Sequence, residues 1–338
     1  MVAIDAEGGD TAGLLFRYEC NGSEFRVRIL KEPPAGFDQG DTLPTKFIEK
    51  WVGVSVRWNG EEMATFEENI AAEKEIDTFV EKLAVPMILE LAPPASDRGE
   101  GDFIRVNLQE YLYPDVFNLQ IVSKGGEVQI IRSDDFPPYN PHPPVPFIAG
   151  AGEEVPSFSP AAIQVLERYR PSAMKVSVDD QIFFCKVSAD HGSFLREYKI
   201  LQKILDAHAQ KAINTPRLRG VIMVEEGVVG LLMDFIETDR PDLTYDLDAG
   251  KSLTLAQRAR WAAQIEKTVQ QLHAMDVVWG NAKPASILID THSNAWITDF
   301  GGGTTEGWVD RELEGTKEGD LQALEKILAD VRGQSSRE

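Results

Sequence analysis

The chain has 338 residues, 43% of them hydrophobic, so it is long enough to build two domains with separate cores. Its 55 acidic and 34 basic residues give a formal net charge of −21, which argues against nucleic acid and anionic membrane surfaces as partners. Two cysteines, Cys20 and Cys185, cannot form a disulfide framework, and no basic leader or membrane-length apolar run is visible. We therefore expect a cytoplasmic or nuclear protein that does not contact a membrane.

The first part of the chain predicts a mixed α+β domain. Alternating apolar residues predict four strands that form two hairpins, at 14–20, 24–30, 116–122 and 128–131. The segments 47–58 and 103–108 also read as strands, whereas 67–91 has helical spacing that Pro86 is expected to break. Residues 1–133 contain no recognisable catalytic, metal-binding or phosphate-binding motif, so their role stays open.

A proline-rich stretch follows this domain. Six prolines lie between Asp134 and Pro146, where they oppose helix formation and remove backbone donors from any sheet. Glycines and acidic residues then continue the irregular composition. We therefore predict a linker at 134–155 and a second domain at 156–338.

The second domain begins with a pattern of strands followed by a helix. The strands are expected at 163–167, 174–178 and 181–187. The third strand carries Lys186 inside an apolar run, and the helix after it carries Glu197 beside its apolar face. Each residue has an ordinary alternative, since the lysine can face water at a sheet edge and the glutamate can sit on a solvated helix surface. A functional ion pair between them is the more specific interpretation.

The later part of the domain carries the most specific motifs. Thr254 and Gln257 fit a capping box that begins a long helix reaching Leu272. The helix leads into Trp279-Gly-Asn-Ala-Lys-Pro-Ala-Ser286, then an apolar strand and a turn. A second apolar strand ends at Asp299-Phe-Gly-Gly-Gly303.

This order of motifs resembles the protein-kinase-like superfamily. Asp299-Phe300-Gly301 matches the kinase metal-binding motif, and 279–286 stands where the catalytic loop belongs. The loop and the added glycines are similar to those of fungal kinase-like proteins with a WGDAKPDN-type loop and a DFGGG motif. The resemblance implies a two-lobed kinase-like fold, with an N-lobe at about 156–235 and a reduced C-lobe at about 236–332.

The resemblance also implies roles for individual residues. Lys186 and Glu197 would pair at the phosphates of ATP, and Asp299 would hold Mg²⁺. Met233 and Phe235, at the junction of the two lobes, would line the adenine site. The cofactor implied is therefore ATP with Mg²⁺.

The catalytic loop departs from the kinase pattern at two positions. Asn281 replaces the aspartate that serves as base, and an amide cannot accept a proton near neutral pH. Ser286 replaces the asparagine that ligates metal, while Lys283 is retained. The segment 169–174, expected over the phosphates, contains no glycine. Because losing a base costs about 10²- to 10⁴-fold in rate, this degenerate loop argues against conventional protein kinase activity.

The leading interpretation is a pseudokinase that binds a nucleotide or another ligand and acts through a protein partner. We interpret the changes at Asn281, Ala285 and Ser286 as natural rather than engineered. Two alternatives stay open: an atypical transferase or ATP-independent biosynthetic enzyme on a kinase-like fold, and a scaffold with no cofactor. The sequence does not name the substrate, the partner or the oligomeric state.

Overall fold

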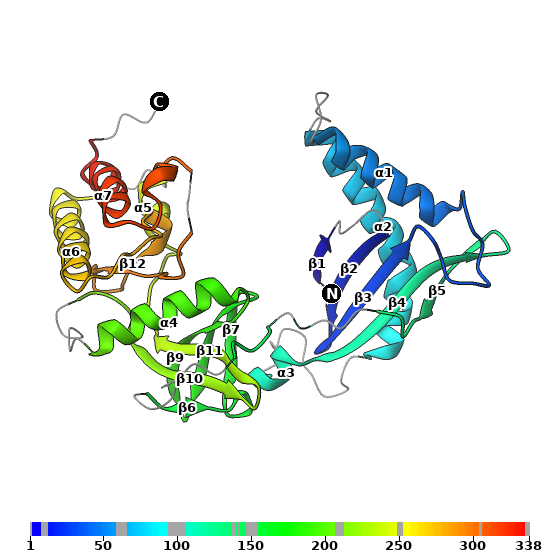
Figure 1. Ribbon diagram of the computed structural model, residues 1–338, viewed down its shortest axis with the longest axis horizontal. Coiled ribbons are helices and arrows are strands. Elements are labelled where there is room, and N and C mark those ends of the chain that lie inside the picture. The colour runs from blue at the N-terminus through cyan, green and yellow to red at the C-terminus, as the bar shows by residue number, and fades with distance from the viewer. Residues whose placement is uncertain are drawn as a thin grey trace. The chain divides into compact units, whose positions relative to one another are not determined.

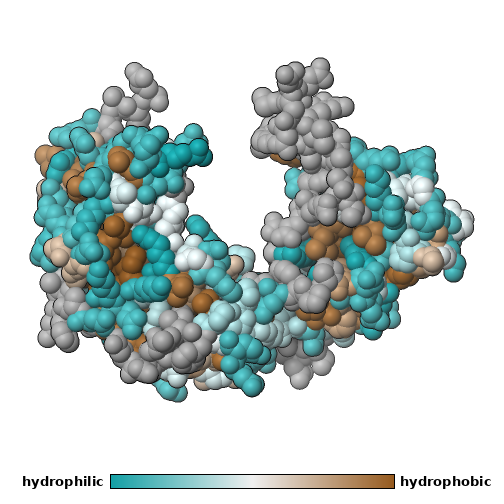
Figure 2. Space-filling view, viewed as in Figure 1, coloured by the Kyte–Doolittle hydropathy of each residue, from teal (hydrophilic) through white to brown (hydrophobic). Residues whose placement is uncertain are grey.

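The computed structural model describes residues 2–7, 13–58, 66–93, 106–136, 140, 142–146, 155–206, 213–248, 253–303 and 306–334. The chain divides into two compact units, Met1–Tyr139 and Asn140–Glu338 (Figure 1). No helix in the described residues is both long and apolar enough to span a bilayer. On the face drawn in Figure 2, hydrophilic residues cover much of the described surface, in keeping with a chain that is 26% charged.

The first unit contains a five-stranded sheet in the order β1-β2-β3-β4-β5. Its strands are Val2–Glu7, Gly13–Cys20, Ser23–Leu30, Asp115–Lys124 and Glu127–Arg132. The two predicted hairpins are confirmed as the antiparallel pairs β2–β3 and β4–β5. Strands β3 and β4 run parallel, which requires a long crossover between them.

Two helices provide that crossover and pack on the sheet, α1 (Leu43–Trp58) and α2 (Phe66–Leu91) (Figure 1). The strand predicted at 47–58 is wrong, because the chain there lies within α1. Thr42 and Thr45 exchange hydrogen bonds between backbone and side chain at the start of α1, and Pro44 lies in its first turn, which are strong signals for a helix start.

The expected break at Pro86 is also wrong, since α2 continues through it. A proline inside a helix costs about 3 kcal/mol. Val80, Ala84 and Ile88, on both sides of the proline, are fully buried in the core of the unit. Their packing offsets the lost hydrogen bond. Of the other predicted strand, 103–105 lie outside the described residues and Leu108 begins the short helix α3 (Leu108–Leu112).

The second unit begins with a six-stranded sheet in the order β6-β10-β11-β9-β8-β7. In chain order its strands are Ser157–Phe158, Gln164–Arg170, Ala173–Val178, Gln181–Val187, Leu218–Val224 and Gly227–Asp234. The three strands predicted from the sequence are confirmed as β7, β8 and β9. Between β8 and β9, Asp179 and Asp180 both have positive φ, as a tight hairpin turn requires.

Helix α4 (His191–Asp206) follows β9 and buries its apolar face in the core of the unit. Part of the predicted linker lies outside the described residues. In its described part, Val145 exchanges two backbone hydrogen bonds with Val228 of β11, at 2.8 and 3.0 Å. This stretch of the predicted linker is therefore paired with the sheet of the second unit.

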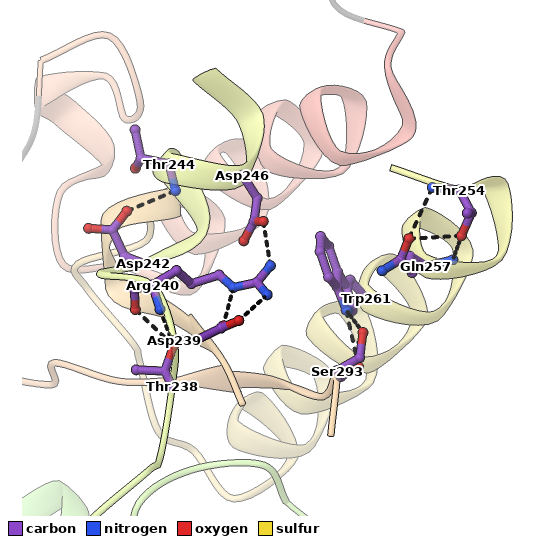
Figure 3. A network of polar contacts seen from close by, with 10 residues as sticks. All are labelled: Thr238, Asp239, Arg240, Asp242, Thr244, Asp246, Thr254, Gln257, Trp261 and Ser293. Carbon is purple, nitrogen blue, oxygen red and sulfur yellow. Dashed lines mark hydrogen bonds and ion pairs between the residues drawn. The ribbon is translucent and has the colours of Figure 1, made fainter. Parts of the chain in front are cut away.

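The remaining elements form a second, mainly helical lobe. They are α5 (Leu243–Asp248), α6 (Leu255–Ala274), α7 (Lys317–Arg332) and the hairpin β12 (Ile287–Ile289) and β13 (Ala295–Ile297). The predicted capping box is confirmed: Thr254 Oγ1 accepts from Gln257 N, and Gln257 Oε1 accepts from Thr254 N (Figure 3). The two-lobed kinase-like fold expected for this unit is thus confirmed.

The segment that enters this lobe is held by an ion pair with a fully buried partner. Arg240 points toward both Asp239 and Asp246, and its Nη1 lies 2.5 Å from Asp246 Oδ1 (Figure 3). The indole of Trp261 on α6 donates to the carbonyl of Ser293, 3.1 Å away, and thereby joins α6 to the turn between β12 and β13. These contacts fix the lobe that carries the loop around Asn281.

Candidate functional site

The structure brings together three charged residues that the sequence had predicted from distant segments. Lys186 Nζ on β9 lies 2.6 Å from Glu197 Oε2 on α4 and 2.8 Å from Asp299 Oδ1 after β13. The glutamate side chain is 3% exposed, whereas the aspartate side chain is 42% exposed. The lysine therefore joins a buried anion to an anion that is open to solvent.

The backbone explains how these side chains meet. Lys186 lies in the middle of the sheet, where its neighbours in register are Ala173 of β8 and Leu231 of β11. This placement excludes the alternative of an edge residue. Burial disfavours its charged form, but the two carboxylates outweigh that effect and raise the pKa of Lys186. The lysine is thus a stable cation inside the site.

Asn281 binds the second carboxylate oxygen of Asp299. Its Nδ2 donates to Asp299 Oδ2 at 2.6 Å, so the two oxygens of this carboxylate receive one bond each from Lys186 and Asn281. Asp299 itself has φ of 61°, a left-handed conformation that aspartate tolerates better than most residues and that often occurs at functional sites. Asn281 is 6% exposed, and its Oδ1 has no hydrogen-bond partner among the described residues.

A buried aspartate that belongs to no predicted motif holds the loop before Asn281. Asp320 on α7 is 2% exposed and accepts from the backbone N–H groups of Trp279 and Gly280, both at 2.7 Å. His273 Nε2 lies 2.9 Å from the same carboxylate. Trp279 is fully buried and its indole donates to Thr298 O at 2.9 Å. The loop is therefore anchored from α7 and from the strand that leads to Asp299.

Arg196, directly before Glu197 on α4, was also missed. Its guanidinium donates to the backbone carbonyls of Val278, Trp279 and Phe300. Helix α4 thus contacts both loops of the site through Arg196 and contacts Lys186 through the next residue, Glu197. The only sequence signal is the pair of glycines at 280 and 302 that leave room for it.

The other predicted site residues lie in both lobes of the second unit. Ser286 is 1% exposed in a short 3-10 helix, and its Oγ has no hydrogen-bond partner in the described part of the chain. Lys283 is half-buried and precedes that helix. Met233 is buried in the core where β11 ends, and Lys175 lies over the ring of Phe235 at 4.4 Å. The roles that the kinase resemblance implies for these four residues stay predictions.

A small cavity of about 10 Å³ lies beside Asn281, with space for one water molecule. Its wall includes Gly303, Glu314, Gly315 and Asp320. The cavity therefore reaches from the loop of Asn281 to the segment before α7. The exposed residue Glu314 therefore lines the same cavity as the asparagine.

The chain is similar in sequence to several protein kinases. It is 30% identical over 223 residues to the serine/threonine-protein kinase Sgk1 of Danio rerio, covering 60% of this chain and 48% of that protein. It is 28% identical over 109 residues to a probable cell division protein kinase of Encephalitozoon cuniculi, covering 32% and 31%. It is 26% identical over 165 residues to the serine/threonine-protein kinase PKH3 of Eremothecium gossypii, covering 40% and 22%.

These similarities support the protein-kinase-like superfamily for this chain. Each match covers less than half of the length of the relative. No protein-family model matches the chain. The two-lobed fold and the relatives thus agree on a kinase-like protein, while its activity, substrate and partners remain proposals.

Proposed function

We propose that the second unit is a kinase-like module that binds a nucleotide and has lost efficient phosphoryl transfer. The observation that carries the proposal is the assembled cluster of Lys186, Glu197 and Asp299. A lysine held by a buried glutamate places a positive charge where phosphate oxygens can bind, and phosphoryl-transfer sites use such a pair. The module would act by presenting its ligand-bound form to a protein partner or by holding a small molecule.

The residues of the cleft fit ATP with a divalent cation in part. Asp299 is exposed enough to ligate a cation, and Mg²⁺ commonly takes one or two carboxylates together with phosphate oxygens and water. No group of three histidine, cysteine or acidic residues placed to hold a metal occurs among the described residues. A bound Mg²⁺ would therefore depend on Asp299 and the nucleotide together, and would neutralise phosphate charge there.

The proposed loss of transfer rests on Asn281. Its amide donates to Asp299 and presents no group that takes up the proton of an acceptor hydroxyl. The expected penalty for the missing base is about 10²- to 10⁴-fold in rate. Binding without turnover is the result of keeping the lysine and the aspartate while replacing the base.

A thermal-shift titration with ATP, with and without Mg²⁺ or Mn²⁺, tests the proposal. The wild-type protein should be stabilised by about 2.7 kcal/mol at a hundredfold excess over the dissociation constant. Lys186→Met and Asp299→Asn should lose that shift. Lys199→Met, which removes an exposed lysine from the same helix as Glu197, is the matched control and should keep it. If folded wild-type protein shows no shift, the protein does not bind ATP, and the scaffold interpretation is favoured.

A second candidate is a small-molecule transferase. The observation in its favour is the unpartnered, buried Oδ1 of Asn281 beside a cavity that Glu314 also lines. A polar ligand group could satisfy this oxygen, with the glutamate carboxylate near it. Incubation with radiolabelled ATP and pooled small hydroxyl and amine compounds distinguishes the two: labelled product supports the transferase, and binding without product supports the first proposal.

A further inference from the structure

The contacts of Arg196 join three segments that are far apart in the chain. Its Nη2 donates to Val278 O at 2.9 Å and its Nη1 to Trp279 O at 3.1 Å, both in the loop before Asn281. The same Nη1 donates to Phe300 O, directly after Asp299. One guanidinium on α4 therefore holds the backbone of both loops of the site.

The neighbouring glutamate reinforces this arrangement. Glu197 Oε1 accepts from the N–H of Phe300 at 3.4 Å, while its Oε2 pairs with Lys186. The peptide groups around Phe300 are thus held by two successive residues of α4. Any rotation of α4 away from the loops would break the Lys186–Glu197 pair and the carbonyl contacts of Arg196 together.

Two glycines form the space in which the guanidinium lies. Gly280 has φ of 69° and Gly302 has φ of 83°, both in the left-handed region. A Cβ on Gly280 would overlap Arg196 Nη2, and a Cβ on Gly302 would lie 3.3 Å from Arg196 Cδ. Glycine is therefore favoured at both positions, because it tolerates positive φ and because it leaves room for the side chain of Arg196.

We propose that Arg196 is a positioning residue that keeps α4 docked on both loops, so that the Lys186–Glu197 pair is preassembled. Because its acceptors are backbone carbonyls, the docking needs no added phosphate and no partner side chain. The cleft is then held in its binding-competent arrangement by the chain itself. The consequence for nucleotide affinity rests on the proposed function, whereas the docking of α4 does not.

Helix α4 offers a matched control for this arginine. Lys203, on the same helix, also reaches the helical lobe, where its Nζ donates to Asp276 O at 2.8 Å. That contact is exposed and involves neither loop. Removing this contact tests whether any hydrogen bond between the lobes keeps α4 docked, or whether the contacts of Arg196 are required.

Hydrogen–deuterium exchange of the ligand-free protein tests the docking directly. Arg196→Met should accelerate exchange about tenfold or more in α4 and in segments 278–281 and 299–302, because it removes charge-assisted hydrogen bonds. Exchange in α6 should stay unchanged, which separates loss of docking from general destabilisation. Lys203→Met should leave both loop segments at the wild-type rate.

A folded Arg196→Met protein with wild-type exchange in these segments overturns the proposal. If Arg196→Met does not fold, Arg196→Lys replaces it, since it keeps the charge but cannot form the fork to three carbonyls. The same variants in the ATP thermal-shift titration then report on affinity. Wild-type protein without any ATP shift would refute nucleotide binding, and the exchange result would still decide the docking of α4.

A double-mutant cycle with Gly280 gives a second, independent measurement. Gly280→Ala should accelerate exchange in 278–281, since a Cβ there overlaps the guanidinium. In Arg196→Ala the overlap is gone, so adding Gly280→Ala should cost less than it does alone, and a non-additive cycle results. Additive effects would show that the glycine serves only its own backbone conformation and would contradict the proposed packing.

Discussion

Asn281 has a structural effect on its neighbour Asp299, in addition to the loss of a base that we propose for it. Its amide lies 2.6 Å from one oxygen of Asp299, while the other oxygen pairs with Lys186. An aspartate at position 281 would place two carboxylates in direct contact, which is unfavourable unless a proton or a cation lies between them. The amide therefore stabilises the metal-free cleft, which a carboxylate would not.

We expect Asn281→Asp to lower the stability of the metal-free second unit by about 1–3 kcal/mol, because a hydrogen bond is replaced by repulsion. Saturating Mg²⁺ should recover part of the loss by bridging the two carboxylates. Thermal unfolding in EDTA and in Mg²⁺ measures both effects. Asn281→Ala is the control: it loses the hydrogen bond but should gain nothing from Mg²⁺, and equal behaviour of the two variants would contradict the argument.

Replacing Ser286 with asparagine, the residue that the kinase resemblance implies at this position, is a less clean test. Ser286 is 1% exposed, so the longer asparagine side chain would have to fit at a buried position. Overpacking of this kind typically costs about 1–3 kcal/mol. Phosphate transfer by Ser286→Asn, alone or combined with Asn281→Asp, is therefore interpreted only beside thermal unfolding of the same variant.

The contact of His142 within the second unit predicts a pH dependence. His142 is 6% exposed and its Nδ1 donates to Ser188 O at 3.2 Å. Burial lowers the pKa of His142 in the folded protein, so the unfolded chain binds the proton more readily. The contribution of a neutral His142 is therefore complete above its ordinary pKa of about 6.5 and is lost as the pH falls below it.

We therefore expect the unfolding temperature of the second unit to fall between about pH 7.5 and about pH 5.5, in the direction set by this linkage. His142→Gln removes the titrating group and should flatten the profile in that window. A His142→Gln protein with an unchanged slope would assign the effect to other groups.

The elements differ in how far the sequence could predict them. Strands with one buried face, such as β2 and β8, show alternation that depends on local geometry alone, and they were predicted. Helix α1 was missed because its valines and tryptophans favour strands, and its cap at Thr42 was overlooked. The persistence of α2 through Pro86 depends on tertiary packing, which local rules do not contain.

The residues of the site were likewise predictable only where a local sequence pattern marks them. Lys186, Glu197, Asn281 and Asp299 were found because each belongs to a motif with a chemical role. Arg196 was not, because its acceptors are backbone carbonyls more than eighty positions away, and a carbonyl leaves no trace in the sequence. Asp320 was missed for the same reason, since it accepts from backbone N–H groups.

At the scale of the whole molecule, each compact unit has a hydrophobic core of its own. Ile29 of β3 is fully buried in the core of the first unit, and Ile265 of α6 is fully buried in that of the second. Domains with separate cores can unfold as separate cooperative units. The predicted division of the chain at its proline-rich stretch therefore has a thermodynamic test.

We expect calorimetry of the full chain to resolve two unfolding transitions. Ile29→Ala and Ile265→Ala each remove buried methyl groups and leave a cavity, at a cost of about 2–5 kcal/mol. Each substitution should move one transition and leave the other in place. ATP with Mg²⁺ should raise only the transition that Ile265→Ala lowers, because the proposed nucleotide cleft lies entirely within the second unit. A single transition that both substitutions shift equally would instead mean that the two cores unfold as one cooperative system.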